Sequence, residues 1–366
     1  MKPPTTAAEL VNIALGVNDI YLAAAVFDLA NHLQQQGLEN VMFAKRRDAL
    51  TLASWEHTSA NVLQALSKSN ETAVQLRLVL RHAANKQGMN YKKLINKKTN
   101  HSSVIEHALE LVKQAKDSDL SLSNFKTLVS GADAAVRTRI ATNMALPAEY
   151  LAVFVTDQSV SVRRALATRP DLDVHIMQKL SIDSDDWVRQ RLGRNPALSL
   201  ALMQQLAIDK VDEVRRAITR NKNCPIKLLE QLAKDKCAWV IAGVAYQANT
   251  SSHLMRRLAT DSDIDVLSGV ASNQNTPASI LMKLTKHEDA DVRRGVILNP
   301  KARRLTLKPL LQDAYYLHRI LLVSHPKLTP TDKWTLHDDP DFRVRFSVFK
   351  WFADSLHRHQ MANYVS

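Results

Sequence analysis

The chain has 366 residues and a formal net charge of +13, and 45% of its residues are hydrophobic and 23% charged. This composition is ordinary for a folded globular protein, but 8 glycines and 12 prolines are too few for the many turns of an all-β or α/β chain. Two cysteines exclude a disulfide framework and an all-cysteine metal or iron–sulfur site.

The N-terminal stretch MKPPTTAAELVNIALG does not have the pattern of a secretory signal, because Glu9 interrupts its short apolar run. No run of the chain approaches 18 apolar residues, so we expect no membrane span and no membrane partner. The low cysteine count fits a reducing compartment. We therefore expect a cytoplasmic protein.

Residues 1–130 are expected to form an N-terminal helical region of degenerate repeats. Leu63, Leu66 and Val74 have the spacing of apolar residues in the regular repeats that follow. A basic insertion at about 84–104 interrupts this region, and it has no acidic residue between 85 and 100. Lysines around Tyr91 suit a nucleic-acid contact, with a solvated loop as the alternative. The candidate lysines are Lys92, Lys93, Lys97 and Lys98.

Residues 131–366 carry a regular 26-residue repeat without gaps. Steps of 26 from Val136 give valine at eight of nine positions, with His318 as the exception. We call this residue position 0. An arginine follows at +1 in most repeats, an apolar residue at +4, leucine at +18 and aspartate at +21. Such self-similarity predicts a repeat architecture.

Each repeat is expected to form two helices of roughly nine residues, because apolar residues recur at 0, +4, +15 and +18. One of them is short enough to be a single 3₁₀ turn. Asn195-Pro196 is expected to end a first helix, and Thr276 and Pro277 to be the N-cap and first residue of a second. The aspartate at +21 is expected to cap the next helix.

Such short helices are marginal alone, so the repeats must stack. We therefore predict an all-α, superhelical α-solenoid of about 26-residue two-helix repeats. The segments VRQRLGRNP (188–196) and VRRGVILNP (292–300) resemble the variant leucine-rich repeat, a HEAT-like solenoid family, and the resemblance covers at least 136–350. The resemblance implies the architecture, a helical solenoid. The iron–sulfur cluster of a founding member is not expected here, because its cysteines are lacking, and we expect no cofactor and no metal.

The arginines fall into two classes. Those at +1 recur with the aspartates at +21, which predicts a structural ladder of ion pairs. Those at +2, +3 and +6 have no regularly placed acidic partner, and stacking would align them into a basic column suited to phosphate. A merely solvated face is the alternative. The candidate residues are Arg139, Arg164, Arg191, Arg194, Arg216, Arg220 and Arg294.

We expect a non-enzymatic scaffold whose basic surface binds DNA or RNA through phosphates. One alternative is an adaptor that holds an acidic or extended polypeptide, within a multi-protein complex. HEAT-like solenoids also include alkylpurine DNA glycosylases, and that resemblance implies Asp185, Asp186 and Trp187 as catalytic candidates. Trp187 and Trp239, two repeats apart, should share a face, where packing is the simpler role and base stacking the alternative.

Overall fold

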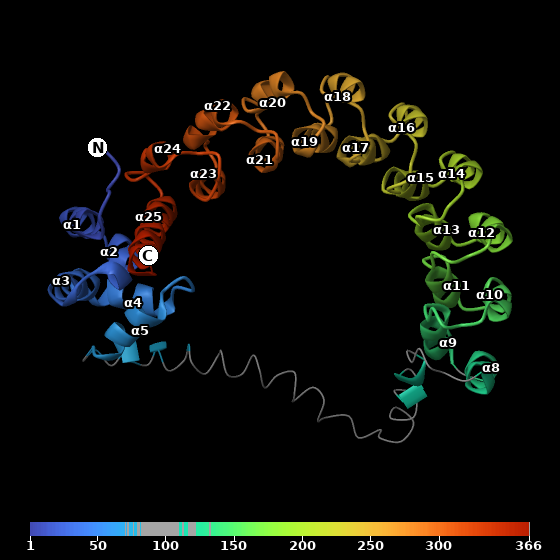
Figure 1. Cartoon of the computed structure of the whole chain (residues 1–366), viewed down its shortest axis with the longest axis horizontal. Helices are drawn as coiled ribbons and strands as arrows, with labels where there is room; N and C mark the ends of the chain where they lie inside the picture. Colours follow the sequence, from blue (N-terminus) through green and yellow to red (C-terminus); the bar gives the residue numbers. More distant parts are fainter. Residues whose placement is uncertain are drawn as a thin grey trace. The chain divides into compact units, whose positions relative to one another are not determined.

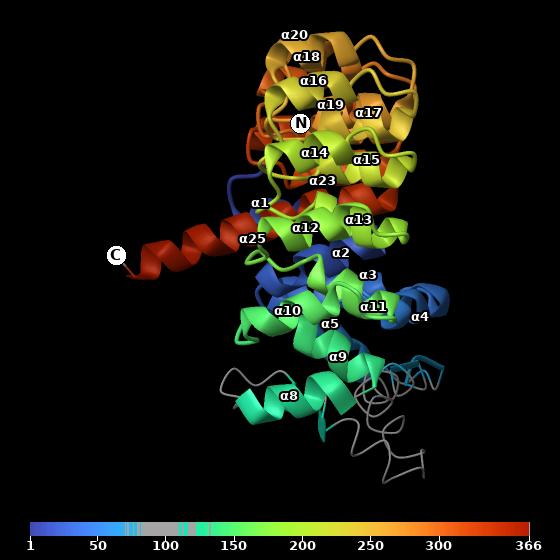
Figure 2. The ribbon, with the colours of Figure 1, turned by 90° about the vertical axis from the view of Figure 1, so that its right-hand side faces the viewer.

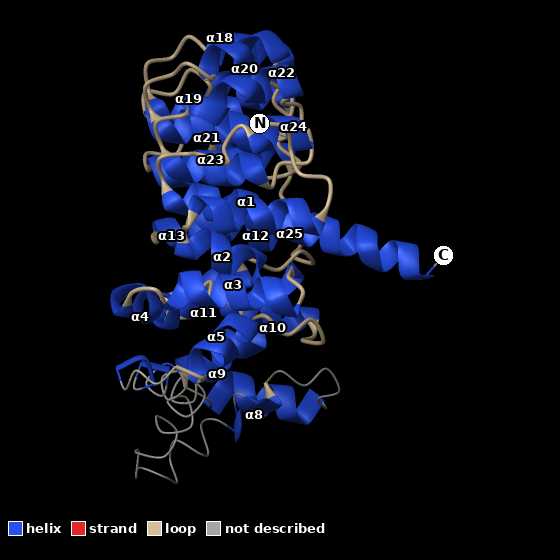
Figure 3. Cartoon of the chain, turned by 90° about the vertical axis from the view of Figure 1, so that its left-hand side faces the viewer, coloured by secondary structure: helices blue, strands red, loops and turns tan. Residues whose placement is uncertain are grey.

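The computed structural model describes residues 1–69, 71, 73–75, 77, 78, 81, 110, 111, 113–115, 122–131 and 133–365. Every regular element within these ranges is a helix (Figure 3), which confirms the predicted all-α class. The candidate lysines Lys92, Lys93, Lys97 and Lys98 lie outside the described residues. Within the described ranges, no helix is long and apolar enough to cross a membrane.

The chain divides into two compact units, which are described separately. Residues 100–302 form the central unit, and residues 1–99 together with 303–366 form the terminal unit. The boundary drawn from the sequence at residue 130 falls within the central unit.

The central unit consists of two layers of short helices. The A helices carry position 0 of each repeat and lie on the inner side of the curved layer pair, whereas the B helices lie on the outer side (Figure 1). Figure 2 views the stacked repeats from the side of the B helices. The A helices are α9 (Ala134–Ala141), α11 (Val160–Leu166), α13 (Asp186–Gly193), α15 (Asp212–Thr219), α17 (Ala238–Tyr246), α19 (Ile264–Ser272) and α21 (Ala290–Leu298). The B helices are α8 (Leu122–Gly131), α10 (Ala148–Phe154), α12 (Val174–Ser181), α14 (Leu200–Leu206), α16 (Ile226–Leu232), α18 (Ser252–Leu258) and α20 (Ala278–Leu284).

The predicted core positions are buried. Val188, Leu192, Met203 and Leu206, at positions 0, +4, +15 and +18 of one repeat, are all at most 3% exposed. Both elements of each regular repeat in the central unit are α-helices. The predicted 3₁₀ alternative occurs in the terminal unit, where α22 (Arg304–Leu307) continues into the 3₁₀ helix η2 (Lys308–Gln312).

Two local predictions about helix starts are wrong by one or two residues. The N-cap of α20 is Pro277, and the Thr276 hydroxyl instead donates to the Val270 carbonyl at 2.5 Å. Asp183, at +21, accepts from the Asp185 backbone N–H at 2.9 Å in a turn before the helix. The side chain that caps α13 is that of Asp185, which accepts from the Val188 N–H at 2.9 Å. In the loop before α13, Asp183 therefore stabilises a turn, and a second aspartate, Asp185, caps the helix.

The predicted arginine–aspartate ladder is confirmed. In the central unit four +1 arginines donate from Nε to the carboxylate 20 residues later, at 2.6–2.7 Å. Arg189, for example, binds Asp209, and its Nη1 donates to the Asp183 carbonyl at 2.7 Å. Each rung therefore joins an arginine of an A helix to the loop before that helix and to the loop before the next A helix. These rungs are Arg137–Asp157, Arg163–Asp183, Arg189–Asp209 and Arg215–Asp235.

A second ladder follows the asparagines at +7, and it was not predicted. The buried Asn221 side chain donates to the Gly193 carbonyl at 3.0 Å and to the Asn195 carbonyl at 2.7 Å. Gln247 makes the same two contacts one repeat later, to the Thr219 and Asn221 carbonyls. These amides satisfy carbonyls that the end of an A helix leaves without an intrahelical partner. They bind each repeat to the one before it.

Position +3 is a glycine in α17, α19 and α21, where the A helices pack closely. A Cβ at Gly269 would lie 2.7 Å from the Cβ of Ala245, and one at Gly295 would lie 2.7 Å from the Cβ of Ala271. Both distances are shorter than real Cβ contacts. In the earlier repeats the same position holds arginine or alanine, as Arg139, Ala165, Arg191 and Ala217, so the glycines at +3 are confined to the later repeats of the central unit.

In the terminal unit, the first helices of the chain cover the last repeat. Tyr21 stacks on Phe342 at 4.2 Å between ring centroids, and Trp55 contacts Phe346 edge-on at 4.4 Å. Arg345 donates to Asp19 at 2.7 Å, whereas the regular ladder partner of Arg345 would be residue 365, a valine. The N-terminal segment therefore supplies the carboxylate that the last repeat lacks.

The helices of the terminal unit come from both ends of the chain. They are α1 (Ala7–Val17), α2 (Ile20–Val26), the 3₁₀ helix η1 (Phe27–Leu29), α3 (His32–Phe43), α4 (Arg46–Ser54), α5 (Ala60–Ser67), α22, η2, α23 (Tyr316–Val323), α24 (Pro330–Trp334) and α25 (Phe342–Val365).

Candidate nucleic-acid interface

Four arginines of two neighbouring repeats gather at α13 and α15. Arg191 and Arg194 lie at the end of α13, and Arg216 and Arg220 occupy the corresponding part of α15. We call these four residues the arginine cluster. Arg191, Arg194 and Arg220 are exposed, and Arg216 is half-buried. Because the A helices form the inner layer of the central unit, the cluster lies on that layer (Figure 1).

The arginines of the cluster repel one another. Arg194 is exposed but partly desolvated by its neighbours, and this desolvation lowers its pKa below the ordinary value, while the charges of Arg220 and Arg191 lower it further. Burial also lowers the pKa of Arg216, and again Arg220 and Arg194 add to the effect. The positive charges are therefore close enough to disfavour each other.

The cluster also has unused hydrogen-bond donors. Within the described ranges, no carboxylate forms an ion pair with any of its four arginines, in contrast to the +1 arginines Arg189 and Arg215 of the same helices. The Nε of Arg216 is buried and has no hydrogen-bond acceptor among the described residues. A buried donor without an acceptor costs free energy. The Arg216 Nε is therefore a donor that no described residue satisfies.

Exposed aromatic rings border the cluster. The Arg164 guanidinium lies 5.6 Å from the Trp187 ring centroid, and the Arg216 guanidinium lies 4.3 Å from that of Trp239. Trp187 remains 53% exposed and Trp239 54% exposed, and Tyr246 on α17 is 52% exposed. Both tryptophans occupy position −1 of an A helix, which agrees with the expectation that they share a face.

A groove joins the first tryptophan to the cluster. It has a volume of about 270 Å³, and its charged lining residues are Arg191 and Arg194, beside Trp187. Thr168, Gln190, Asn195 and Pro196 complete its lining.

One candidate arginine has an acidic partner after all. Arg164 forms a bidentate ion pair with Asp185, with Nε–Oδ1 and Nη2–Oδ2 distances of 2.9 and 2.6 Å. The expectation that the +2 arginines lack acidic partners is therefore wrong for Arg164. Sequence spacing did not reveal the pair because the next +2 arginine, Arg216, has Cys237 at the corresponding place.

The catalytic candidates Asp185 and Asp186 sit at the start of α13. The hydrogen bonds from Arg164 lower the pKa of Asp185, partly offset by burial, and the Val188 N–H lowers it again. Asp185 is thus held as a carboxylate by a structural ion pair and a helix cap. Asp186 is half-buried in the first turn of α13.

Two other candidate arginines lie apart from the cluster. Arg139 is exposed on α9, and Arg294 is exposed on α21. The candidate arginines are therefore densest at α13 and α15.

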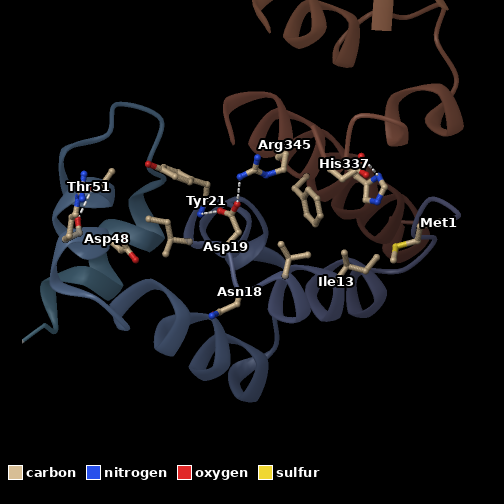
Figure 4. A pocket seen from close by; sticks show the side chains of 14 residues that line it. Met1, Ile13, Asn18, Asp19, Tyr21, Asp48, Thr51, His337 and Arg345 are labelled. Atoms are coloured by element: carbon tan, nitrogen blue, oxygen red, sulfur yellow. Dashed lines mark hydrogen bonds and ion pairs between the residues drawn. The ribbon is translucent and has the colours of Figure 1, made fainter. Parts of the chain in front are cut away.

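A cavity of the terminal unit has a different character. It has a volume of about 920 Å³ and lies among α1, α2, α4 and α25. The Asp19–Arg345 ion pair lies in it, and Asp48 and His337 line its edges (Figure 4). Both acidic and basic side chains line this cavity, so it is not uniformly positive as the arginine cluster is.

The chain has a structural likeness to a known repeat protein. No protein-family model matches the sequence, and no curated protein matches it. Among solved structures, the chain is similar to "a leucine-rich repeat variant with a novel repetitive protein structural motif", with 24% identity over 61% of this chain and 88% of that one, and a TM-score of 0.44. The chain is an all-helical repeat protein.

Proposed function

We propose that this protein is a non-enzymatic repeat scaffold that binds nucleic acid through phosphate contacts at the arginine cluster. One observation carries the proposal. The arginines at +1 are neutralised by aspartates, whereas Arg191, Arg194, Arg216 and Arg220 lie together without a carboxylate partner among the described residues.

Phosphate fits this arrangement chemically. Bringing like charges together costs free energy unless an anion neutralises them, and a guanidinium offers a planar pair of donors to phosphate oxygens. The backbone of DNA and of RNA presents such oxygens in a row, so several arginines can be used at once. The net charge of +13 adds long-range attraction.

The role of Asp185 supports a scaffold over a base-excision enzyme. A catalytic carboxylate has to reach the reacting sugar or base, but Asp185 is engaged by Arg164 and by the α13 backbone. An acidic polypeptide is the other ligand class for the cluster, and the experiment below tells the two apart. We place the protein in the cytoplasm, a location supported by the free Cys224 and Cys237 thiols.

The test is binding of a fluorescein-labelled oligonucleotide to the full chain, measured by anisotropy. The double variant Arg194→Ala/Arg220→Ala removes two exposed guanidinium groups without touching the buried core. We expect at least a tenfold weaker affinity. The slope of log affinity against log salt should become shallower by about 0.7–0.9 for each phosphate that the variant no longer neutralises.

The matched control is Arg139→Ala/Arg294→Ala, which removes the same charge from exposed positions outside the cluster. It should weaken binding by less than threefold. Equal losses in both variants would contradict a localised site. Binding of a polyglutamate competitor with no binding of the oligonucleotide would replace the proposal by the adaptor function.

A further inference from the structure

The exposed aromatic residues next to the arginine cluster are not required by the repeat. Position −1 of the A helices is Trp187 in α13 and Trp239 in α17, but it is alanine, serine, glutamate or aspartate in the other repeats of the central unit. Position +6 is Tyr246 in α17 and threonine, arginine, serine or leucine elsewhere. Since those repeats fold without a ring there, packing does not explain the three aromatic residues.

An arginine guanidinium lies against the ring of each tryptophan. Arg164 is fixed by Asp185 at 2.6 Å and lies by Trp187, and Arg216 lies by Trp239. A cation over a ring is attracted to its electron-rich face and so limits its motion. About half of each indole nevertheless stays exposed. The rings are thus held in place and offer free apolar surface beside the cluster.

We propose that the bound nucleic acid is single-stranded, with its bases stacked on Trp187, Trp239 and Tyr246 while its phosphates contact the arginine cluster. This inference rests on the proposed function. In a duplex the faces of the bases are covered by their neighbours, so a protein ring reaches them only after unstacking. A single strand exposes these faces, and stacking on aromatic side chains beside a positive groove is the usual way to hold it.

Carboxylates occupy position −1 of the other A helices around the site. The residue is Glu213 in α15, Asp265 in α19 and Asp291 in α21, and all three are exposed. Because carboxylates repel phosphates, the phosphates of the strand are expected to lie toward the arginine cluster and away from position −1 of these helices.

The test compares two probes, a labelled oligothymidylate of about twelve nucleotides, within the range of known single-strand sites, and a labelled duplex of the same length. The wild-type chain should bind the single strand at least tenfold more tightly. Trp187→Ala/Trp239→Ala should lose at least tenfold in affinity for the single strand and less than twofold for the duplex. Trp187→Phe/Trp239→Phe should recover most of the loss.

The matched control is Leu298→Ala, because Leu298 is an exposed apolar residue at position +6 of α21, outside the site. It should bind both probes as the wild type does. If the tryptophan variant loses equal affinity for both probes, or none for either, stacking is wrong while phosphate binding stands. If the wild type binds neither probe, the proposed function itself is wrong.

Discussion

At the scale of single residues, the arginines show what spacing can and cannot predict. The partner of Arg189 could be predicted because the aspartate recurs with the arginine in most periods. The partner of Arg164 could not, because its carboxylate is not repeated in register. The asparagine ladder was missed for a different reason. Asn221 binds backbone carbonyls, and these are present whatever the sequence is.

Removal of a ladder arginine should destabilise the protein strongly. Arg215 and Asp235 are both at least nine-tenths buried in their side chains, so Arg215→Ala leaves a buried carboxylate without its partner. We expect a loss of about 3 kcal/mol in the free energy of unfolding, measured by urea denaturation. Arg294→Ala, which removes an exposed arginine, should change it by less than about 0.5 kcal/mol.

The cost of Arg215→Ala should depend on pH. Burial raises the pKa of Asp235, but hydrogen bonds from Arg215 and the Cys237 N–H outweigh it and leave the pKa below its ordinary value. A carboxylate whose pKa is lower in the folded chain than in the unfolded chain stabilises the fold. This stabilisation is complete above the pKa of the unfolded chain, about 3.9, and is lost as the pH falls through the pKa of the folded chain. Without Arg215, burial raises the pKa of Asp235 in the variant, so the difference between wild type and variant should be largest near pH 7 and shrink as the pH falls and that carboxyl takes up a proton. A difference that grows on acidification would contradict the ion-pair account.

At the scale of helices, the sequence predicts the two-helix repeat well because apolar residues keep one register through the chain. Helix starts were less accurate. Asp183 and Thr276 each use their side chain in the preceding turn, and short polar residues serve such turns and helix caps equally. The close approach of α17, α19 and α21 depends on the glycines at +3, whose role becomes visible only when neighbouring helices are in place.

Gly269→Ala should therefore destabilise the central unit. The new Cβ would lie 2.7 Å from the Ala245 Cβ and 3.3 Å from the Ala242 carbonyl oxygen, so α17 and α19 would have to move apart. We expect a loss of about 1–3 kcal/mol, measured by thermal or urea unfolding.

The control is Gly16→Ala in α1, where a Cβ would meet nothing within 4 Å. Alanine favours the helix at such a site, so this variant should be as stable as the wild type or up to about 1 kcal/mol more stable. A neutral Gly269→Ala would show that the A helices are not in tight contact.

At the scale of the whole molecule, the repeats alone do not predict how the chain organises its ends. Arg345 pairs with Asp19, and no periodicity links two residues so far apart in sequence. The candidate site was predictable in part. Arg191, Arg194, Arg216 and Arg220 stood out from the sequence as arginines without partners, but their convergence beside Trp187 and Trp239 depends on how the A helices stack.

The salt dependence of oligothymidylate binding by the wild-type chain tests the central claim most directly, because counterion release counts the phosphates that are neutralised. Between about 50 and 200 mM salt, three to four cluster arginines predict a straight line of log affinity against log salt with a slope of about −2 to −3. Affinity that does not change with salt, or no binding at the lowest salt, would contradict the account.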